Sequence, residues 1–188
     1  MIQKSVSWFT KIRFFLTKII PRLNLYYLEI QPPSIDSMEY TTHNLKETYD
    51  LAKKFVAGKL LCGCKERKNA TVVGLFGELG AGKTSFTQGI AKAFRIKDYI
   101  TSPTFVLEKI YKLGKGFDFE RLIHIDAYRL NGGEEMGALG WQEILENSKN
   151  IVFIEWPERV ESVLPKDMIK IYFEHGKDEN ERKIKILC

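Results

Sequence analysis

Hydrophobic and polar residues follow one another along the chain in patterns that predict an ordered series of strands and helices. An apolar, β-branched run at 71–76 indicates a buried strand, and apolar residues at helical spacing predict a helix over 84–94. A continuous apolar run at 151–154 is typical of a fully buried strand. The other predicted elements are a short strand and an amphipathic helix from Met38 onward, strands at 105–111 and 121–126, and a loop with a short helix at 131–150.

The C-terminal region alternates apolar and polar residues on both sides of a charged turn. This pattern, over 168–187, predicts a closing β-hairpin. Strands and helices interleave in the first part of the chain, whereas strands dominate the last part. We therefore predict an α/β fold in which a mixed sheet is flanked by helices and ends in a C-terminal β-hairpin.

The loop between the strand at 71–76 and the helix at 84–94 is rich in glycine. Its sequence GELGAGKT, over 77–84, fits the phosphate-binding pattern G-x-x-x-x-G-K-[ST], so the predicted fold is that of a P-loop NTPase. Glycines let backbone N–H groups close around phosphate oxygens, and the following helix directs its positive end at the same anion. The predicted nucleotide contacts come from Glu78, Leu79, Gly80, Ala81, Gly82, Lys83, Thr84 and Ser85.

Two residues of this loop have specific expected roles. Lys83 would reach the β- and γ-phosphates, and the Thr84 hydroxyl would bind Mg²⁺. We expect the Lys83 side chain to be solvated until phosphate binds. A dinucleotide-binding loop is excluded, because that pattern needs glycine or alanine where this chain has Ser85.

A P-loop that binds Mg²⁺ needs at least one acid at the end of a neighbouring buried strand. Glu155 ends the apolar run 151–154, and Asp126 ends the predicted strand at 121–126. For either acid alone, a solvated side chain or an ion pair with a nearby arginine is the alternative. His124 points to the same side of its strand as Asp126, so it either orients that acid or serves as a structural histidine.

Composition narrows the classes of protein further. The chain has 188 residues, 44% hydrophobic and 28% charged, which suits a globular protein of about one domain. The net charge of +5 equals that of residues 1–28 alone, so the basic balance does not indicate a nucleic-acid-binding domain. Three cysteines, an odd number, argue against a disulfide framework and for a reducing compartment, and Cys62 and Cys64 have no further ligands at zinc spacing.

Residues 1–37 form a basic, aromatic-rich segment that we predict to be separate from a P-loop ATPase domain at 38–188. Three interpretations of the segment stay open: a dispensable extension with Met38 as the true start, an amphipathic helix at a membrane surface, or a targeting segment. Its longest charge-free apolar run is too short to span a bilayer. For the domain we expect a cytoplasmic location and no stable membrane association.

The ordered set of segments GELGAGKTSF, SPTF, HIDAYRL and EWPERV, over 77–160, resembles the TsaE family. The resemblance covers about 38–187. It implies a compact ATPase that binds ATP and Mg²⁺ and works with the proteins TsaB and TsaD, and that meets tRNA only indirectly, through the complex with them. That complex makes N6-threonylcarbamoyladenosine at position 37 of tRNAs. Residues 1–37 depart from the family pattern, which begins near Met38.

The resemblance also implies roles for particular residues. It places Lys83 on phosphate, Thr84 and Glu155 on Mg²⁺, and Asp126 where it positions the metal or the attacking water. The expected catalytic residues are accordingly Asp126, Lys83 and Thr104. Thr104 belongs to the SPTF segment and would respond to the γ-phosphate.

The same matching makes Trp156 part of the nucleotide site. The sequence has no arginine-finger signature and no guanine-selecting Asn-Lys-x-Asp, so we expect an ATPase that is weak alone and is stimulated by its partners.

Two other functions use the same loop. A small-molecule kinase would transfer the γ-phosphoryl group to an acceptor, but it usually needs an arginine-rich lid, and the arginines of this chain are scattered. A nucleotide-gated binding module would bind ATP and a partner without hydrolysis. Labelled ATP distinguishes the three, because a kinase yields a phosphorylated acceptor, an ATPase yields free phosphate, and a binding module yields neither.

Overall fold

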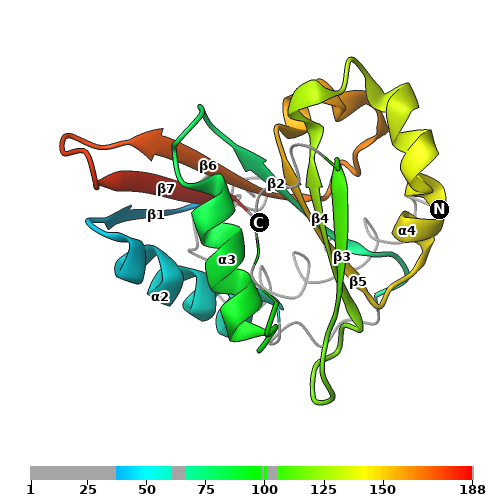
Figure 1. The fold of residues 1–188 in the computed structure, drawn as a ribbon, viewed down its shortest axis with the longest axis horizontal. Coiled ribbons are helices and arrows are strands. Elements are labelled where there is room, and N and C mark those ends of the chain that lie inside the picture. The colour runs from blue at the N-terminus through cyan, green and yellow to red at the C-terminus, as the bar shows by residue number, and fades with distance from the viewer. Residues whose placement is uncertain (1–36, 61–66, 99, 101–105, 188) are drawn as a thin grey trace, which may run out of the picture. The chain divides into compact units, whose positions relative to one another are not determined.

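The computed structural model describes residues 37–60, 67–98, 100 and 106–187. These residues form a seven-stranded sheet with the strand order β1-β7-β6-β2-β5-β4-β3 (Figure 1). The inner strands β6, β2, β5 and β4 run parallel, whereas β1, β7 and β3 pair antiparallel with their neighbours. The strands are β1 (Ser37–Thr42), β2 (Thr71–Phe76), β3 (Glu108–Lys112), β4 (Arg121–Asp126), β5 (Asn150–Glu155), β6 (Ile169–His175) and β7 (Arg182–Leu187). The predicted α/β fold with a mixed sheet is confirmed.

The predicted C-terminal hairpin is formed by β6 and β7. Their register runs from Lys170 opposite Leu187 to His175 opposite Arg182. The hairpin is not a separate unit, since β6 also pairs with β2 and β7 pairs with β1. The first and last strands of the described chain therefore lie side by side at one edge of the sheet.

The strands at the centre of the sheet are buried on both faces, as their continuous apolar sequences predict. All six residues of β5 are buried. Phe153 belongs to an apolar cluster with residues of two long helices, and its neighbour Val152 belongs to a second cluster on the opposite face. Each face of the central sheet thus carries its own core.

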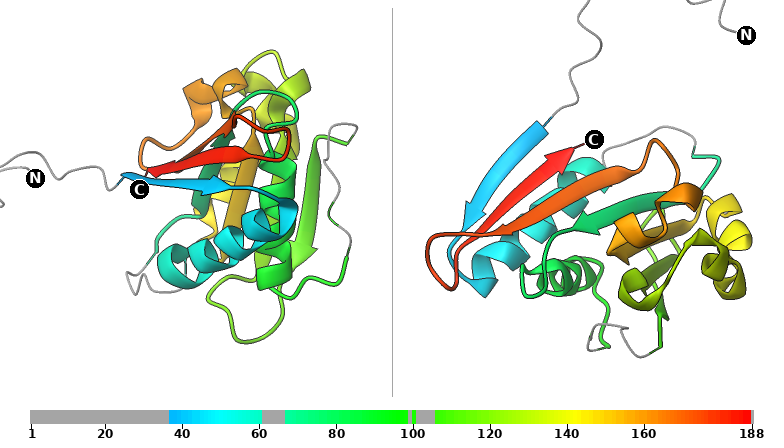
Figure 2. Two further views of the ribbon diagram at one scale, coloured as in Figure 1. Left: turned by 90° about the vertical axis from the view of Figure 1, so that its left-hand side faces the viewer. Right: turned by 90° about the horizontal axis from the view of Figure 1, so that it is seen from above.

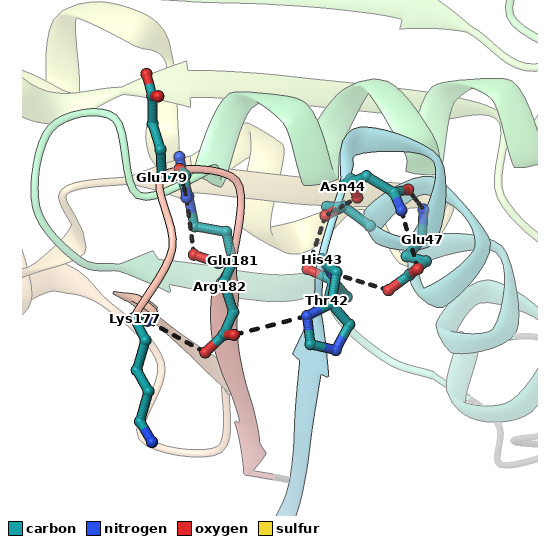
Figure 3. Close-up of polar contacts among 9 residues, drawn as sticks. Thr42, His43, Asn44, Glu47, Lys177, Glu179, Glu181 and Arg182 are labelled. Carbon is teal, nitrogen blue, oxygen red and sulfur yellow. Dashed lines mark hydrogen bonds and ion pairs between the residues drawn. The ribbon is translucent and has the colours of Figure 1, made fainter.

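The long helices α2 (Leu45–Phe55) and α3 (Lys83–Ala93) pack against each other over one face of the sheet (Figure 2). The start of α2 is fixed by a variant of the capping box: Oδ1 of the N-cap residue Asn44 accepts a hydrogen bond from Glu47 N at 2.9 Å, and Glu47 Oε2 accepts one at 2.8 Å from the N–H of His43, the residue before the N-cap (Figure 3). A π-helical turn, Val56–Leu60, continues α2.

Shorter helices cover the opposite face. Helix α4 (Trp141–Glu146) supplies Trp141 and Ile144 to the second apolar cluster. The predicted loop and short helix at 131–150 are confirmed. The 3₁₀ turns of this side are η3 (Ala127–Arg129), η4 (Gly133–Leu139), η5 (Pro157–Arg159) and η6 (Glu161–Val163).

Two element boundaries differ from the predicted ones. The helix expected over 84–94 occupies Lys83–Ala93. The strand expected at 105–111 begins only at Glu108, because Leu107 has a φ of 63°, which an extended strand does not allow. Instead, the carbonyl of Leu107 accepts a 2.9 Å hydrogen bond from Asp126 N.

Strand β1 includes Ser37, which pairs with Leu187, so this strand begins one residue before Met38. Residues 1–36 lie outside the described part of the chain, so the three interpretations of the N-terminal segment stay predictions. The cysteines, Cys62, Cys64 and Cys188, also lie outside it. Across 37–60, 67–98, 100 and 106–187, we find no helix long and apolar enough to cross a membrane.

Candidate functional site

A cavity of about 330 Å³ lies where β2, β4 and β5 end and α3 begins. The carboxyl ends of parallel strands are the usual place for a ligand in an α/β sheet. The cavity brings together residues from three segments that are far apart in the sequence. It is lined by Leu79, Gly80, Gly82, Lys83, Thr84, Ser85, Asp126, Tyr128, Glu155 and Trp156.

Steric and conformational constraints explain why the loop has glycine at two of its positions. A Cβ on Gly77 would lie 2.4 Å from the carbonyl oxygen of Phe173 in β6, so only glycine lets the loop pass this close to the strand. Gly82, the N-cap residue of α3, has a φ of 102° and no side chain that could cap the helix. The first N–H groups of α3 therefore meet no side-chain cap, which is the arrangement that binds anions at helix N-termini.

Lys83 is folded back into the loop. Its Nζ donates hydrogen bonds to the carbonyls of Gly77 at 2.6 Å and Glu78 at 2.8 Å, and it lies 4.0 Å from the ring centroid of Trp156. The residue is only 4% exposed. The expectation that Lys83 is solvated before phosphate binds is therefore wrong, because the loop carbonyls and the indole ring replace water.

Two effects of the surroundings act in opposite directions on the pKa of Lys83. Burial lowers the pKa of its ammonium group below the ordinary value of 10.5, while the carboxylates of Glu155, Glu158 and Asp126 act in the opposite direction. Glu158 was not among the residues identified from the sequence. Partial desolvation strengthens the attraction of this ammonium group for an entering phosphate, whereas the neighbouring carboxylates repel a polyanion unless a further cation neutralises them.

Three side chains meet at the end of β5. The hydroxyl of Thr84 donates a 2.8 Å hydrogen bond to Oε1 of Glu155, and the imidazole Nε2 of His124 lies 2.9 Å from the same oxygen. The hydroxyl and carboxylate oxygens are hard donors of the kind that Mg²⁺ prefers, and Mg²⁺ takes few protein ligands beside phosphate and water. The pair of Thr84 and Glu155 thus fits the predicted metal site.

His124 contacts Glu155, whereas its position in the strand indicated Asp126. It lies on the same face as Asp126, as predicted, but its hydrogen bond goes to Glu155 on the neighbouring strand. The imidazole is fully buried, and its Nδ1 has no hydrogen-bond partner among the described residues. The structure therefore shows a buried histidine that contacts Glu155 across the strand pair, which neither interpretation made from the sequence described.

Asp126 lies directly opposite Glu155 in the register of β4 and β5. Its carboxylate is buried, and Oδ1 accepts a 3.0 Å hydrogen bond from Tyr128 N, which starts the 3₁₀ turn η3. The two acids predicted from separate apolar runs are therefore neighbours at the same sheet edge and line the same cavity.

An aromatic pair forms one wall of the cavity. Trp156 has a φ of 58°, and its ring lies 5.1 Å from that of Tyr128, at an interplanar angle of 52°. Tyr128 is 47% exposed and was not predicted to line the site. Its position two residues after Asp126 at the end of a strand is the signal that identifies it, because such residues lie at the ligand-binding edge.

Two other predicted residues of the loop contribute no side chain to the cavity lining. Ala81 is fully buried in the apolar cluster beneath α2 and α3, and Glu78 contacts the site through its carbonyl, which accepts from Lys83. Neither side chain lines the cavity. Thr104 lies outside the described residues.

A glycine-rich loop between a parallel strand and a helix, with acids at the ends of two adjacent parallel strands, defines a P-loop NTPase fold. The sequence profile of one protein family, Threonylcarbamoyl adenosine biosynthesis protein TsaE, matches residues 42–184. The chain belongs to the TsaE family.

Individual relatives agree with this assignment. The chain is 39% identical over 102 residues to the tRNA threonylcarbamoyladenosine biosynthesis protein TsaE of Streptomyces coelicolor; the match covers 53% of this chain and 66% of that protein, just under two thirds. It is 37% identical over 133 residues to the protein of the same name from Rickettsia prowazekii, covering 70% of this chain and 83% of the relative. The crystal structure of Bacillus subtilis YdiB superimposes with a TM-score of 0.62 at 29% identity, covering 80% of this chain and 84% of the other.

Proposed function

We propose that this chain is the ATP-binding and ATP-hydrolysing subunit required, with TsaB and TsaD, for N6-threonylcarbamoyladenosine modification of tRNA at adenosine 37. The observation that carries the proposal is the meeting of Lys83, Thr84, Asp126 and Glu155 at one cavity in a chain of the TsaE family. The odd cysteine count supports the cytoplasm as its compartment.

The loop and the start of α3 bind the phosphates of ATP in this proposal. Backbone N–H groups around Gly80 and Gly82 surround the phosphate oxygens, and Lys83 moves its hydrogen bonds from the loop carbonyls to the β- and γ-phosphates. Thr84 and Glu155 would hold Mg²⁺, which neutralises phosphate charge. His124 keeps the Glu155 carboxylate in place from behind.

Asp126 acts on the attacking water. Its carboxylate lines the cavity, and Oδ1 accepts a hydrogen bond from Tyr128 N, which fixes the acid at the end of β4. A carboxylate held at this place can accept a proton from the water. Water then forms the new P–O bond while the bond to the β-phosphate oxygen breaks, which releases ADP and inorganic phosphate. Trp156 and Tyr128 form the apolar wall of the same space.

Catalysis by the chain alone is slow in this proposal. The described residues that line the cavity include one lysine and no arginine, so the charge that develops on the γ-phosphoryl group lacks a second cation. A partner that supplies such a group, or that orders the site, raises the rate. We therefore propose that TsaB and TsaD stimulate hydrolysis and contact the tRNA, so that this chain acts on tRNA indirectly.

Reconstitution tests the proposal. The full chain is combined with TsaB, TsaD, ATP, threonylcarbamoyl-adenylate and tRNA, and both phosphate release and modified nucleoside are measured. We expect both phosphate release and the modified nucleoside to require this chain with Lys83 intact. Lys83→Ala should lower the affinity for ATP by about a hundredfold or more, because the lysine binds the β- and γ-phosphates. Lys97→Ala removes an exposed lysine as the control and leaves both activities unchanged.

Three results would contradict parts of the proposal. Unchanged ATP affinity in Lys83→Ala would refute the phosphate-loop assignment. A phosphorylated acceptor without free phosphate would identify a kinase. Nucleotide-dependent partner binding without phosphate release, even in the full mixture, would identify a binding module.

A further inference from the structure

The phosphate-binding loop is held from behind by the C-terminal hairpin. Nη2 of Arg182 donates a 3.2 Å hydrogen bond to the carbonyl of Gly80, and the His175 Nε2 lies 3.3 Å from the carbonyl of Leu79. His175 and Arg182 are directly opposite each other in the register of β6 and β7. One cross-strand pair therefore contacts two successive peptide groups of the loop.

The guanidinium of Arg182 is itself fixed by the turn of the hairpin. Its Nη1 donates to the carbonyls of Glu179 at 2.6 Å and Glu181 at 2.8 Å (Figure 3). Its aliphatic stem lies beside Gly82, where a Cβ would be 3.7 Å from Arg182 Cγ. Arg182 does not line the cavity, so its contacts with the site run through the backbone of the loop.

The hairpin turn is in turn connected to the start of α2. The carboxylate of Glu181 accepts a 3.2 Å hydrogen bond from Lys177 N, and its other oxygen lies 3.6 Å from Nδ1 of His43 (Figure 3). The segment beginning at His43 carries the capping box of α2. The support for the loop thus extends from β6 and β7 to the start of helix α2.

Holding a carbonyl also fixes the N–H group of the same peptide unit, because that unit is planar and its N–H points opposite to its C=O. The Leu79 carbonyl faces His175, so the N–H of Gly80 points away from the hairpin. The peptide unit of the Gly80 carbonyl places Ala81 N 3.2 Å from Glu78 O, which closes the turn of the loop. A glycine in an unconstrained loop samples many backbone conformations. In this loop Gly80 has a φ of 75°, and the contacts to its neighbouring carbonyls favour that conformation.

We propose that Arg182, assisted by His175, is a positioning residue that preorganises the phosphate-binding loop for the β-phosphate of the nucleotide. It acts through the Gly80 carbonyl and touches no substrate. The inference rests on the proposed nucleotide site and adds a residue from the opposite end of the chain to it. Because the loop holds the phosphate shared by ATP and ADP, loss of the guanidinium weakens both nucleotides alike.

The test uses the full chain with Arg182→Met, which keeps the stem and removes the guanidinium. Lys183→Met is the matched control, since it removes one exposed positive charge from the next residue of β7. We expect Arg182→Met to weaken a fluorescent ATP analogue and ADP by about tenfold each, as the loss of one charge-assisted hydrogen bond predicts, and Arg182→Lys to recover part of the loss. In the assembled complex KM for ATP rises by a similar factor while kcat stays within about twofold.

Amide hydrogen exchange of the nucleotide-free protein supplies a second readout. If the guanidinium orders the loop, peptides covering 77–86 exchange their amide hydrogens faster in Arg182→Met than in wild type. In Lys183→Met these peptides exchange at the wild-type rate. Wild-type exchange in Arg182→Met, or an equal loss of affinity in Lys183→Met, overturns the inference. If the loop loosens in Arg182→Met but the wild-type chain binds no nucleotide, the proposed function fails, and only the ordering of the loop by Arg182 stands.

Discussion

The Thr84 hydroxyl donates a 2.8 Å hydrogen bond to Oε1 of Glu155, and this contact joins the first turn of α3 to the end of β5. The same oxygen also receives the imidazole of His124 from β4, at 2.9 Å. One carboxylate oxygen thus connects three elements of the fold. The contact places both proposed Mg²⁺ ligands within reach of one ion before any nucleotide is bound.

Glu155→Gln is expected to weaken Mg²⁺-dependent binding. An amide is a poorer Mg²⁺ ligand than a carboxylate, so the Mg²⁺ concentration needed for half-maximal binding of a fluorescent ATP analogue rises by about tenfold or more. Titration of Mg²⁺ at fixed nucleotide measures it. Glu161→Gln removes an exposed carboxylate that does not line the cavity and serves as the control. Equal Mg²⁺ requirements in wild type and Glu155→Gln would place the metal elsewhere.

Asp126→Asn is expected to separate binding from turnover. Asparagine keeps an oxygen that can accept from Tyr128 N, so the 3₁₀ turn and the cavity are preserved. It is a much poorer proton acceptor, and phosphate release in the assembled complex falls by about a hundredfold while ATP affinity changes little. If Asp126→Asn instead raises the Mg²⁺ requirement and leaves turnover intact, Asp126 is the metal ligand and the two acids exchange roles.

Gly89→Ala is expected to destabilise the packing of α2 on α3. A Cβ on Gly89 would lie 2.7 Å from the Cβ of Ala52 and 3.0 Å from the Cα of Tyr49, so the helices must move apart. Overpacking of this kind costs about 1–3 kcal/mol, which exceeds the gain in helix propensity and lowers the melting temperature by about 3–8 °C. Gly137→Ala, with no heavy atom within 4 Å, is the control and melts close to wild type. A melting temperature of Gly89→Ala at or above wild type would contradict the close approach.

Glu108→Gln is expected to change how stability depends on pH. Burial raises the pKa of Glu108 above its ordinary value of 4.5, and its Oε1 has no hydrogen-bond partner among the described residues. The folded state therefore binds this proton more tightly than the unfolded state. As the pH rises above 4.5 through the folded pKa, the proton is lost and the free energy of unfolding decreases.

The variant has no such carboxylate. Glu108→Gln should melt above wild type at pH 7, and the difference should vanish below about pH 4.5. Thermal melts across this pH range measure it, with exposed Glu120→Gln as the control. A difference that is the same at all pH values would mean that packing, not charge, is the cause.

The sequence alone determined the elements that form the centre of the site. The strands β2 and β5 follow from continuous apolar runs, and the loop follows from its glycines and Lys83-Thr84, because these signals are local and depend on neighbouring residues only. Glu155 and Asp126 could be identified for the same reason, since each ends an apolar run.

Tertiary structure alone decided which of these elements are neighbours. The order that places β6 beside β2, and the sharing of Glu155 by Thr84 and His124, depend on pairings between residues 31 to 96 positions apart, which no local periodicity encodes. Lys83 is buried because the loop folds over it. Arg182 reaches Gly80 across 102 positions because the hairpin packs under the loop. Alternating patterns specify which face a side chain occupies, and packing of the whole chain then decides what it meets there.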